Sequence, residues 1–142
     1  LGRRDGLPEN VLRELDETVR VSSSNTGMFL CLALNYGSRA EIVDAVRAVA
    51  AEARDGTLDP AKIDEAAIST HLDSAGVPDP DLVIRTAGEM RLSNFLLWQI
   101  SYAEFYVTDT YWPDFAEAEF HKAIHAYAER HRRFGGLDGS NS

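Results

Sequence analysis

The sequence predicts an α/β fold, in which a parallel sheet is flanked by helices. Three short apolar segments of strand length, residues 28–34, 82–84 and 105–108, alternate with helical patterns along the chain. Strands that alternate with helices are joined by right-handed crossovers and therefore lie parallel. Because a sheet has on average roughly 5–6 strands, we expect N-terminal strands of this sheet to be absent from the chain.

The amino-acid composition indicates a globular domain and argues against a nucleic-acid-binding protein. The chain has 142 residues, 44% of them hydrophobic, which is typical of one soluble globular domain. The net charge of −9 argues against nucleic acid as a partner, since nucleic acids select a basic face. The single cysteine, Cys31, permits no intrachain disulfide and favours a reducing, cytoplasmic compartment. The chain opens at Leu1 rather than Met, and we expect it to begin partway through a longer domain.

The first half of the chain contains two helical patterns around one strand. An amphipathic helix is expected over residues 8–20 and a second over 39–54. The continuous apolar run 28–34 between them is typical of a strand buried on both faces, with Cys31 as an inert buried thiol. Ser38 and Glu41, three residues apart, predict a capping box at the start of the second helix.

The second half of the chain contains further strands and helices, and particular residues mark where several of them begin. Asp59 and Asp64 are each expected to cap a short helix. Strand 82–84 leads to an apolar helix that opens at Ser93, and strand 105–108 leads to a last helix after Asp114. We expect residues 1–136 to form the C-terminal part of a single domain and residues 137–142 to form a polar tail.

Polar side chains concentrate after the three predicted strands. In open α/β sheets, ligands bind outside the carboxyl ends of the strands, so these side chains are expected to converge. Neither a Walker loop nor a G-x-G-x-x-G motif occurs, so nucleotide binding lacks its usual fingerprint. The converging residues are Asn35, Tyr36, Arg39, Arg85, Glu89, Arg91, Ser93 and Asp109.

The segment 85–93 favours a phosphate or diphosphate ligand. Arg85 and Arg91 offer guanidinium groups that bind phosphate oxygens bidentately. Ser93 adds a hydroxyl at the expected start of a helix, where free backbone N–H groups bind anions. The alternative is that both arginines form ordinary ion pairs with neighbouring carboxylates, and spacing does not decide between the two.

Glu104 lies among aromatic residues, where a carboxylate needs a partner. An arginine and a divalent cation are the two candidate partners of Glu104, and the sequence does not decide between them. Mg²⁺ is commonly bound by one or two carboxylates together with substrate phosphates. His121 and His125 have a spacing that can suit zinc, but no third ligand accompanies them, and we expect a solvated helix face instead.

The same residues carry a resemblance to a known family. The segment 81–99, DLVIRTAGEMRLSNFLLWQ, resembles the signature of the cis-prenyltransferases, of which undecaprenyl diphosphate synthase is the common bacterial member. The resemblance covers nearly the whole chain. Further matching segments are Asn25-Thr26-Gly27, Asn35-Tyr36-Gly37-Ser38-Arg39, Tyr102, Glu104, Tyr106, Thr108-Asp109, Trp112-Pro113-Asp114-Phe115 and Arg132-Arg133-Phe134-Gly135-Gly136.

This resemblance implies a homodimer that condenses isopentenyl diphosphate onto an allylic diphosphate with Mg²⁺, giving undecaprenyl diphosphate or a shorter cis-polyprenyl diphosphate. It implies a cytoplasmic protein that contacts the membrane peripherally through its lipid product. By resemblance, Glu104 binds Mg²⁺, and Asn35, Tyr36, Arg39, Glu89 and Asp109 have supporting roles. The residues that would hold isopentenyl diphosphate are Arg85, Arg91, Ser93, Arg133 and Gly135, the last two reaching across the dimer.

The sequence departs from the family pattern in three places. Ala87 and Ser38 stand where the family often has glycine, and a left-handed backbone at Ala87 would be strained. The family's Asp-Gly-Asn-Gly-Arg-Trp-like loop, with its essential aspartate, has no counterpart in residues 1–142. We therefore expect little turnover from this chain alone. The alternatives are a non-catalytic partner subunit of a heteromeric cis-prenyltransferase and an unrelated phosphate-binding α/β domain.

Overall fold

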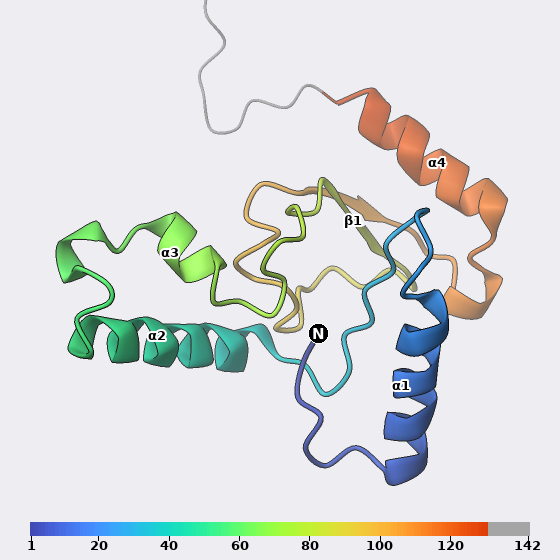
Figure 1. Ribbon diagram of the computed structural model, residues 1–142. Helices are drawn as coiled ribbons and strands as arrows, with labels where there is room; N and C mark the ends of the chain where they lie inside the picture. Colours follow the sequence, from blue (N-terminus) through green and yellow to red (C-terminus); the bar gives the residue numbers. More distant parts are fainter. Residues whose placement is uncertain (131–142) are drawn as a thin grey trace, which may run out of the picture. The chain divides into compact units, whose positions relative to one another are not determined.

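The computed structural model describes residues 1–130. The chain divides into two compact units, Leu1–Val77 and Pro78–Ser142, of which the second is described to residue 130. The helices of the two units are labelled in Figure 1. The helices of the first unit and the strands of the second are built from segments that the sequence pattern already marks.

The first unit consists of helices. They are α1 (Glu9–Ser22), α2 (Ser38–Arg54), the 3₁₀ turn η1 (Pro60–Lys62) and α3 (Glu65–Ser69). Both predicted caps are confirmed, because Asp59 accepts a hydrogen bond from the Ala61 N–H at 3.0 Å and Asp64 accepts one from the Ala67 N–H at 2.8 Å. These caps satisfy N–H groups that a helix start leaves open.

The core of the first unit lies between α2 and the segment around α3. Ala45 and Val49 on α2 are buried, as is Leu72 just beyond α3. No residue of α1 is buried, and its apolar side chains such as Val19 remain exposed. Burial of an apolar face supplies most helical stability, so α1 is the least supported helix of this unit.

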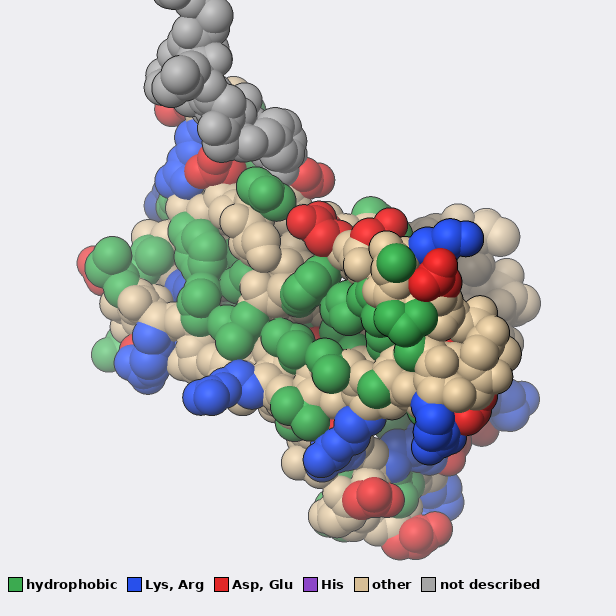
Figure 2. Space-filling model, turned by 90° about the vertical axis from the view of Figure 1, so that its left-hand side faces the viewer, with side chains coloured by type: hydrophobic (Ala, Val, Ile, Leu, Met, Phe, Trp, Pro, Cys, Tyr) green, Lys and Arg blue, Asp and Glu red, His purple; other side chains and the backbone are tan. Residues whose placement is uncertain are grey.

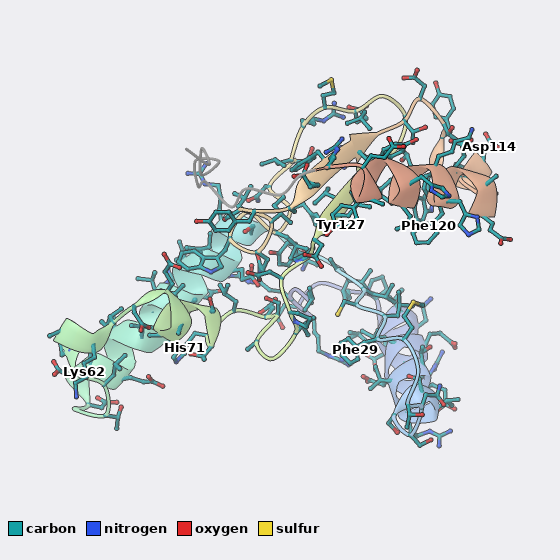
Figure 3. The ribbon with its side chains drawn as sticks, turned by 90° about the horizontal axis from the view of Figure 1, so that it is seen from above. Phe29, Lys62, His71, Asp114, Phe120 and Tyr127 are labelled. Carbon is teal, nitrogen blue, oxygen red and sulfur yellow. The ribbon has the colours of Figure 1, made fainter. Side chains whose placement is uncertain are left out.

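The predicted strand 28–34 is wrong for this structure. The segment is extended but forms no assigned strand, and Met28 and Phe29 are 89% and 78% exposed. Cys31 is exposed rather than buried. A strand buried on both faces needs packing neighbours on both faces. Hydrophobic side chains are visible at the surface of the molecule in Figure 2, and Phe29 is labelled in Figure 3.

Residues 1–3 do form backbone hydrogen bonds with residues 32–35. The Leu1 ammonium group donates to the Leu32 carbonyl at 2.8 Å, and the Leu34 N–H donates to the Leu1 carbonyl at 3.0 Å. This alternation is the hydrogen-bond pattern of a parallel ladder. The Arg3 N–H continues the contact by donating to the Asn35 carbonyl at 3.3 Å.

The predicted capping box of α2 is also wrong. The N-cap is Gly37, and no side chain caps the helix. Ser38 is the first helical residue and is fully buried, and Glu41 points its carboxylate elsewhere. Spacing alone does not distinguish a reciprocal cap from a buried carboxylate with its own partners.

The second unit holds a two-stranded parallel sheet. Strand β1 (Leu82–Arg85) pairs with β2 (Glu104–Val107), with Leu82 opposite Glu104 and Arg85 opposite Val107. The turn η2 (Trp112–Asp114) and helix α4 (Glu117–Ala128) follow. The predicted parallel pairing and the last helix are confirmed, and the buried core includes Ile100 and Ala123.

The helix expected to open at Ser93 does not form. Residues 93–101 make a series of turns, and Ser93, Asn94 and Leu96 have φ angles of 52°, 59° and 45°. Left-handed residues cannot belong to a right-handed α-helix, in which φ is near −63°. The anion site expected from a helix N-terminus at Ser93 is therefore absent from the described structure.

Candidate functional site

The carboxyl ends of β1 and β2 bring two loops together. The Thr108 N–H donates to the Arg85 carbonyl, the Gly88 N–H to the Thr108 carbonyl and the Ala87 N–H to the Thr110 carbonyl, each at 2.9 Å. This backbone network continues the sheet beyond its last pair. It confirms that the polar residues after the second and third predicted strands share one edge.

The turn that follows β1 needs two left-handed residues. Ala87 and Gly88 have φ angles of 59° and 65°. A Cβ atom on Gly88 would lie 3.1 Å from the Asp109 carboxylate oxygen, so a side chain there would push against Asp109. Ala87 pays the strain expected for an alanine at positive φ, of about 1 kcal/mol relative to glycine. The backbone at Gly88 therefore approaches Asp109 closely, and the left-handed conformation at Ala87 is the strained one that the sequence predicted there.

Arg85 carries the most informative atom of this site. It is the last residue of β1 and is half-buried. Its Nε is buried and has no hydrogen-bond acceptor within residues 1–130. A buried N–H of a charged group costs free energy when it is left unpaired. The Nε–H of Arg85 is therefore a hydrogen-bond donor that an anionic ligand could pair with.

For Arg91, the sequence left open whether the guanidinium binds phosphate or forms an ion pair, and the structure contains an ion pair. It pairs with Glu89, and the two side chains are 66% and 36% exposed. An exposed ion pair contributes at most about 1 kcal/mol, because water screens it. Glu89 therefore holds Arg91 only weakly, and an incoming phosphate can compete for the guanidinium group.

Ser93 and Asp109 are exposed side chains beside this turn. Ser93 adopts a left-handed backbone, so its hydroxyl is presented from a turn rather than from a helix end. The backbone N–H of Thr110 donates to the hydroxyl of Thr108 at 3.3 Å, which braces the Asp109 loop.

Glu104 begins β2, and Arg130 is its partner. The Arg130 Nη1 donates to the Glu104 Oε2 at 2.7 Å, with side chains 39% and 28% exposed. Of the two partners that the sequence left open for Glu104, an arginine or a divalent cation, this structure contains the arginine. Sequence reasoning did not single out Arg130, because 26 residues separate the pair and no spacing rule connects a strand start to a helix end.

A magnesium site would depend on Glu104 and on the substrate. Within residues 1–130, no group of three His, Cys, Asp or Glu side chains could hold a metal ion. Mg²⁺ usually keeps several waters and binds one or two carboxylates plus substrate phosphates, so a single carboxylate fits it as one ligand. His121 lies 4.0 Å from Glu117 and is 63% exposed, in agreement with the solvated helix face expected there.

The first unit contains Asn35, Tyr36 and Arg39. They follow the extended segment 28–34, and Arg39 is exposed on α2. The Asn35 side-chain amide donates to the Asp5 carbonyl at 2.9 Å, and the Tyr36 hydroxyl donates to the Glu41 carboxylate at 2.5 Å. In this unit, Asn35 and Tyr36 therefore brace the backbone and a neighbouring carboxylate.

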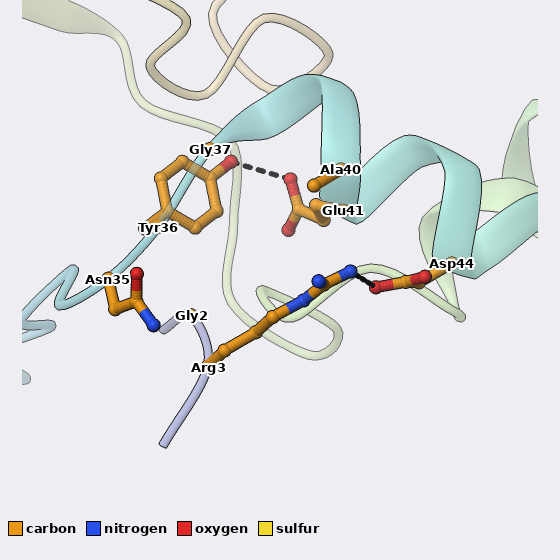
Figure 4. A pocket seen from close by; sticks show the side chains of 8 residues that line it. All are labelled: Gly2, Arg3, Asn35, Tyr36, Gly37, Ala40, Glu41 and Asp44. Atoms are coloured by element: carbon orange, nitrogen blue, oxygen red, sulfur yellow. Dashed lines mark hydrogen bonds and ion pairs between the residues drawn. The ribbon is translucent and has the colours of Figure 1, made fainter. Parts of the chain in front are cut away.

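A small hollow of about 230 Å³ lies beside Tyr36 (Figure 4). Glu41 is buried at one side of it, where its second oxygen accepts the Asp73 N–H at 3.0 Å. Arg3 pairs with Asp44 at another side, which lowers the pKa of the Asp44 carboxyl. The Tyr36 hydroxyl, the Glu41 carboxylate and the Arg3–Asp44 pair at this hollow therefore all have partners among the described residues.

Arg133 and Gly135 lie outside the described residues. No helix of the described part of the chain is long and apolar enough to cross a membrane.

Comparison with known proteins defines the class. A family model described as "Putative undecaprenyl diphosphate synthase" matches residues 1–135. The isoprenyl transferase of Geobacillus kaustophilus is 50% identical over 137 residues, covering 96% of this chain and 53% of the relative. The chain belongs to this family of isoprenyl transferases, and it spans about half the length of the curated relatives it matches.

Solved structures show the same fold. The lavandulyl diphosphate synthase of Lavandula x intermedia, in complex with dimethylallyl diphosphate, matches with a TM-score of 0.91 and 44% identity, covering 95% of this chain and 58% of that one. A "probable undecaprenyl diphosphate synthase" of Campylobacter jejuni matches with a TM-score of 0.79 and 31% identity, covering 95% and 61%. The described structure is therefore a portion of the cis-prenyltransferase fold.

Proposed function

We propose that this chain forms the isopentenyl diphosphate-binding part of a cis-prenyl diphosphate synthase. The reaction condenses isopentenyl diphosphate onto an allylic diphosphate, and the product is undecaprenyl diphosphate or a shorter cis-polyprenyl diphosphate. Residues 1–136 belong to the C-terminal part of one domain, which acts as a cytoplasmic homodimer and contacts the membrane peripherally through its lipid product. The observation that carries the proposal is the unpaired, buried Nε of Arg85 at the carboxyl end of β1.

Each residue has a defined role in this proposal. Arg85 and Arg91 bind the diphosphate of isopentenyl diphosphate, because guanidinium forks match phosphate oxygens. The Ser93 hydroxyl donates to the same group. Arg133 and Gly135 reach the site of the partner subunit, in keeping with the family pattern.

In keeping with the family pattern, Glu104 at the start of β2 would be a ligand of Mg²⁺. When bound, Mg²⁺ neutralises the negative charge that develops on a departing diphosphate. Arg85 and Arg91 hold the isopentenyl diphosphate in place for the attack, which reduces the entropy cost of bringing two substrates together. The family's Asp-Gly-Asn-Gly-Arg-Trp-like loop has no counterpart in residues 1–142, and we propose that turnover requires such a loop in addition to the residues named above.

The test is a calorimetric titration of this chain with isopentenyl diphosphate. Arg85→Met is expected to weaken binding about tenfold or more, since a hydrogen bond to a charged group contributes about 1.5–3 kcal/mol. Arg54→Met serves as the matched control, because Arg54 is exposed and pairs only with Asp55 among the described ion pairs. Equal affinity of Arg85→Met and the unaltered chain would contradict the assignment.

A second assay separates the catalytic and non-catalytic alternatives. The chain is incubated with labelled isopentenyl diphosphate, an allylic diphosphate and Mg²⁺, alone and together with an active cis-prenyltransferase. We expect no incorporation by the chain alone. Stimulation of the active enzyme by the chain would instead favour a partner subunit of a heteromeric enzyme.

A further inference from the structure

The extended segment 28–34 is hydrogen-bonded along one edge and open along the other. The backbone groups of Leu32 and Leu34 bond to Leu1 in a parallel pattern. Neighbouring residues of an extended chain direct their N–H and C=O groups to opposite edges. The alternate residues therefore face the other edge, and they form no backbone hydrogen bond with any of residues 1–130. These alternate residues are Phe29, Cys31 and Ala33.

The side chains of this segment are exposed on both of its faces. Met28 and Leu30, which share one face, are 89% and 72% exposed, and Phe29 on the opposite face is 78% exposed. A strand of a parallel sheet is normally covered on both faces, and an open edge is a template to which another strand adds. The segment therefore fits a partner that supplies a strand along its edge and apolar side chains over both faces.

We propose that residues 28–34 are the docking strand through which this chain binds the remainder of a cis-prenyltransferase domain, including when that remainder is a separate polypeptide. A strand of the remainder lies along Phe29, Cys31 and Ala33, and its apolar side chains cover both faces. The inference rests on one part of the proposed function, the assignment of residues 1–136 to the C-terminal part of one domain.

The need for both an edge and two covers selects this occupant. The chain spans only 53% of the isoprenyl transferase of Geobacillus kaustophilus and 58% of the solved lavandulyl diphosphate synthase chain, so the same fold contains further elements. A lipid surface covers apolar side chains but offers no hydrogen bonds to an open backbone edge. A second copy of this chain brings another net charge of −9, and pairing along one edge leaves both faces of each copy exposed.

The test uses Cys31, which is exposed and is the single cysteine of the chain. The part of the Geobacillus kaustophilus isoprenyl transferase that precedes the matched region is supplied twice, as a fusion ahead of Leu1 and as a separate, co-purified polypeptide. The rate at which a disulfide reagent labels Cys31 is compared with the rate in the chain alone. We expect labelling to slow about tenfold or more in both forms, because a covered thiol reacts poorly.

Lys62 provides matched controls, because it is exposed and lies far from Phe29 within the first unit (Figure 3). The double variant Lys62→Cys, Cys31→Ser should be labelled equally fast with and without the added part. Leu30→Asp should weaken binding of the separate polypeptide about tenfold or more, since the complex removes this leucine from water. Lys62→Asp adds negative charge elsewhere and should leave binding unchanged.

Each outcome decides one point. Equally fast labelling of Cys31 in the fusion and in the chain alone would overturn the docking role. Slow labelling in the chain alone would also overturn it, because the edge would then be occupied without the added part. Protection in the fusion, with no association of the separate polypeptides, would overturn binding between separate chains. Protection of Cys31 in a chain that binds no isopentenyl diphosphate would refute the proposed ligand and leave the docking strand intact.

Discussion

The two units treat their buried polar groups in opposite ways. In the first unit, the buried Glu41 carboxylate accepts hydrogen bonds from the Tyr36 hydroxyl and the Asp73 N–H (Figure 4). In the second unit, the buried Nε of Arg85 has no acceptor among the described residues. A polar group whose partners are built into the fold stabilises that fold, whereas a group left unpaired at the end of a strand is available to a ligand.

Removal of the Glu41 carboxylate is expected to have the largest effect on the stability of the first unit. Glu41→Ala removes the carboxylate that accepts hydrogen bonds from the Tyr36 hydroxyl and the Asp73 N–H, which should lower the free energy of unfolding by about 2–3 kcal/mol. Urea unfolding of α1 and α2, followed by far-ultraviolet circular dichroism, measures the change. Glu14→Ala on the exposed α1 is the control and should have little effect.

The glycine at position 2 tests how tightly the first unit is assembled. A Cβ on Gly2 would lie 2.2 Å from the Leu34 carbonyl oxygen, and its φ is +98°. Gly2→Ala should lower the free energy of unfolding by about 1–3 kcal/mol through overpacking. Gly6→Ala also has positive φ but meets nothing within 4 Å, so it isolates the backbone strain. Equal effects of the two variants would contradict the close contact.

In the loop that follows β1, a substitution at Ala87 is expected to raise the free energy of unfolding rather than lower it. Ala87 adopts a φ of 59°, so Ala87→Gly should raise the free energy of unfolding by about 1 kcal/mol. Both tryptophans, Trp98 and Trp112, belong to this unit. Their fluorescence therefore reports its unfolding, and a destabilised Ala87→Gly would show that the left-handed turn is not formed in solution.

His71 predicts how the first unit responds to pH. Its Nδ1 lies 2.7 Å from the Ala67 carbonyl and 3.3 Å from the Thr70 hydroxyl, and its Nε2 lies 3.1 Å from the Glu52 carboxylate (labelled in Figure 3). The Ala67 carbonyl and then Glu52 raise the pKa of His71 above its ordinary value. This contribution to stability is therefore complete below the ordinary histidine pKa, and it is lost as the pH rises through the raised value.

Urea unfolding at a series of pH values between about 5.5 and 8.5 tests this dependence, since a histidine normally titrates near 6.5. We expect the stability of the first unit to fall toward the alkaline end. His71→Gln should flatten the curve, and an unchanged curve in that variant would assign the dependence to another group.

The smallest stability change is expected at Arg85. Arg85→Met exchanges an unpaired buried donor for an apolar side chain of similar length, so the free energy of unfolding should change by less than about 1 kcal/mol. Tryptophan fluorescence in urea measures it without any ligand. A loss as large as that of Glu41→Ala would mean that Arg85 has a structural partner, and the contrast between the two units would disappear.

The placement of Arg85 and Arg91 at and after the end of β1, and of Glu104 in β2, could be predicted from sequence, whereas the helix expected at Ser93 and the strand 28–34 could not. Arg85, Arg91 and Glu104 were found because arginines and a carboxylate follow or begin strands whose apolar residues are easily recognised. The cap at Asp64 was also predictable, because a cap depends only on neighbours in sequence. The pairing of Glu104 with Arg130, 26 residues away, was not predictable in this way, nor was the hydrogen bond from the Asp73 N–H to the Glu41 carboxylate, 32 residues away.

By itself, the sequence determined the parallel α/β class, the boundaries of α2, β1 and β2 to within a residue or two, the presence of α4, and the family to which the chain belongs. Only the tertiary structure decided that residues 28–34 stay exposed, that Ser93 opens a left-handed turn rather than a helix, and that Arg130 holds Glu104. The physical reason is that periodicity and caps depend on near neighbours. Burial, backbone strain and ion pairs depend on which distant segments are present to pack against them.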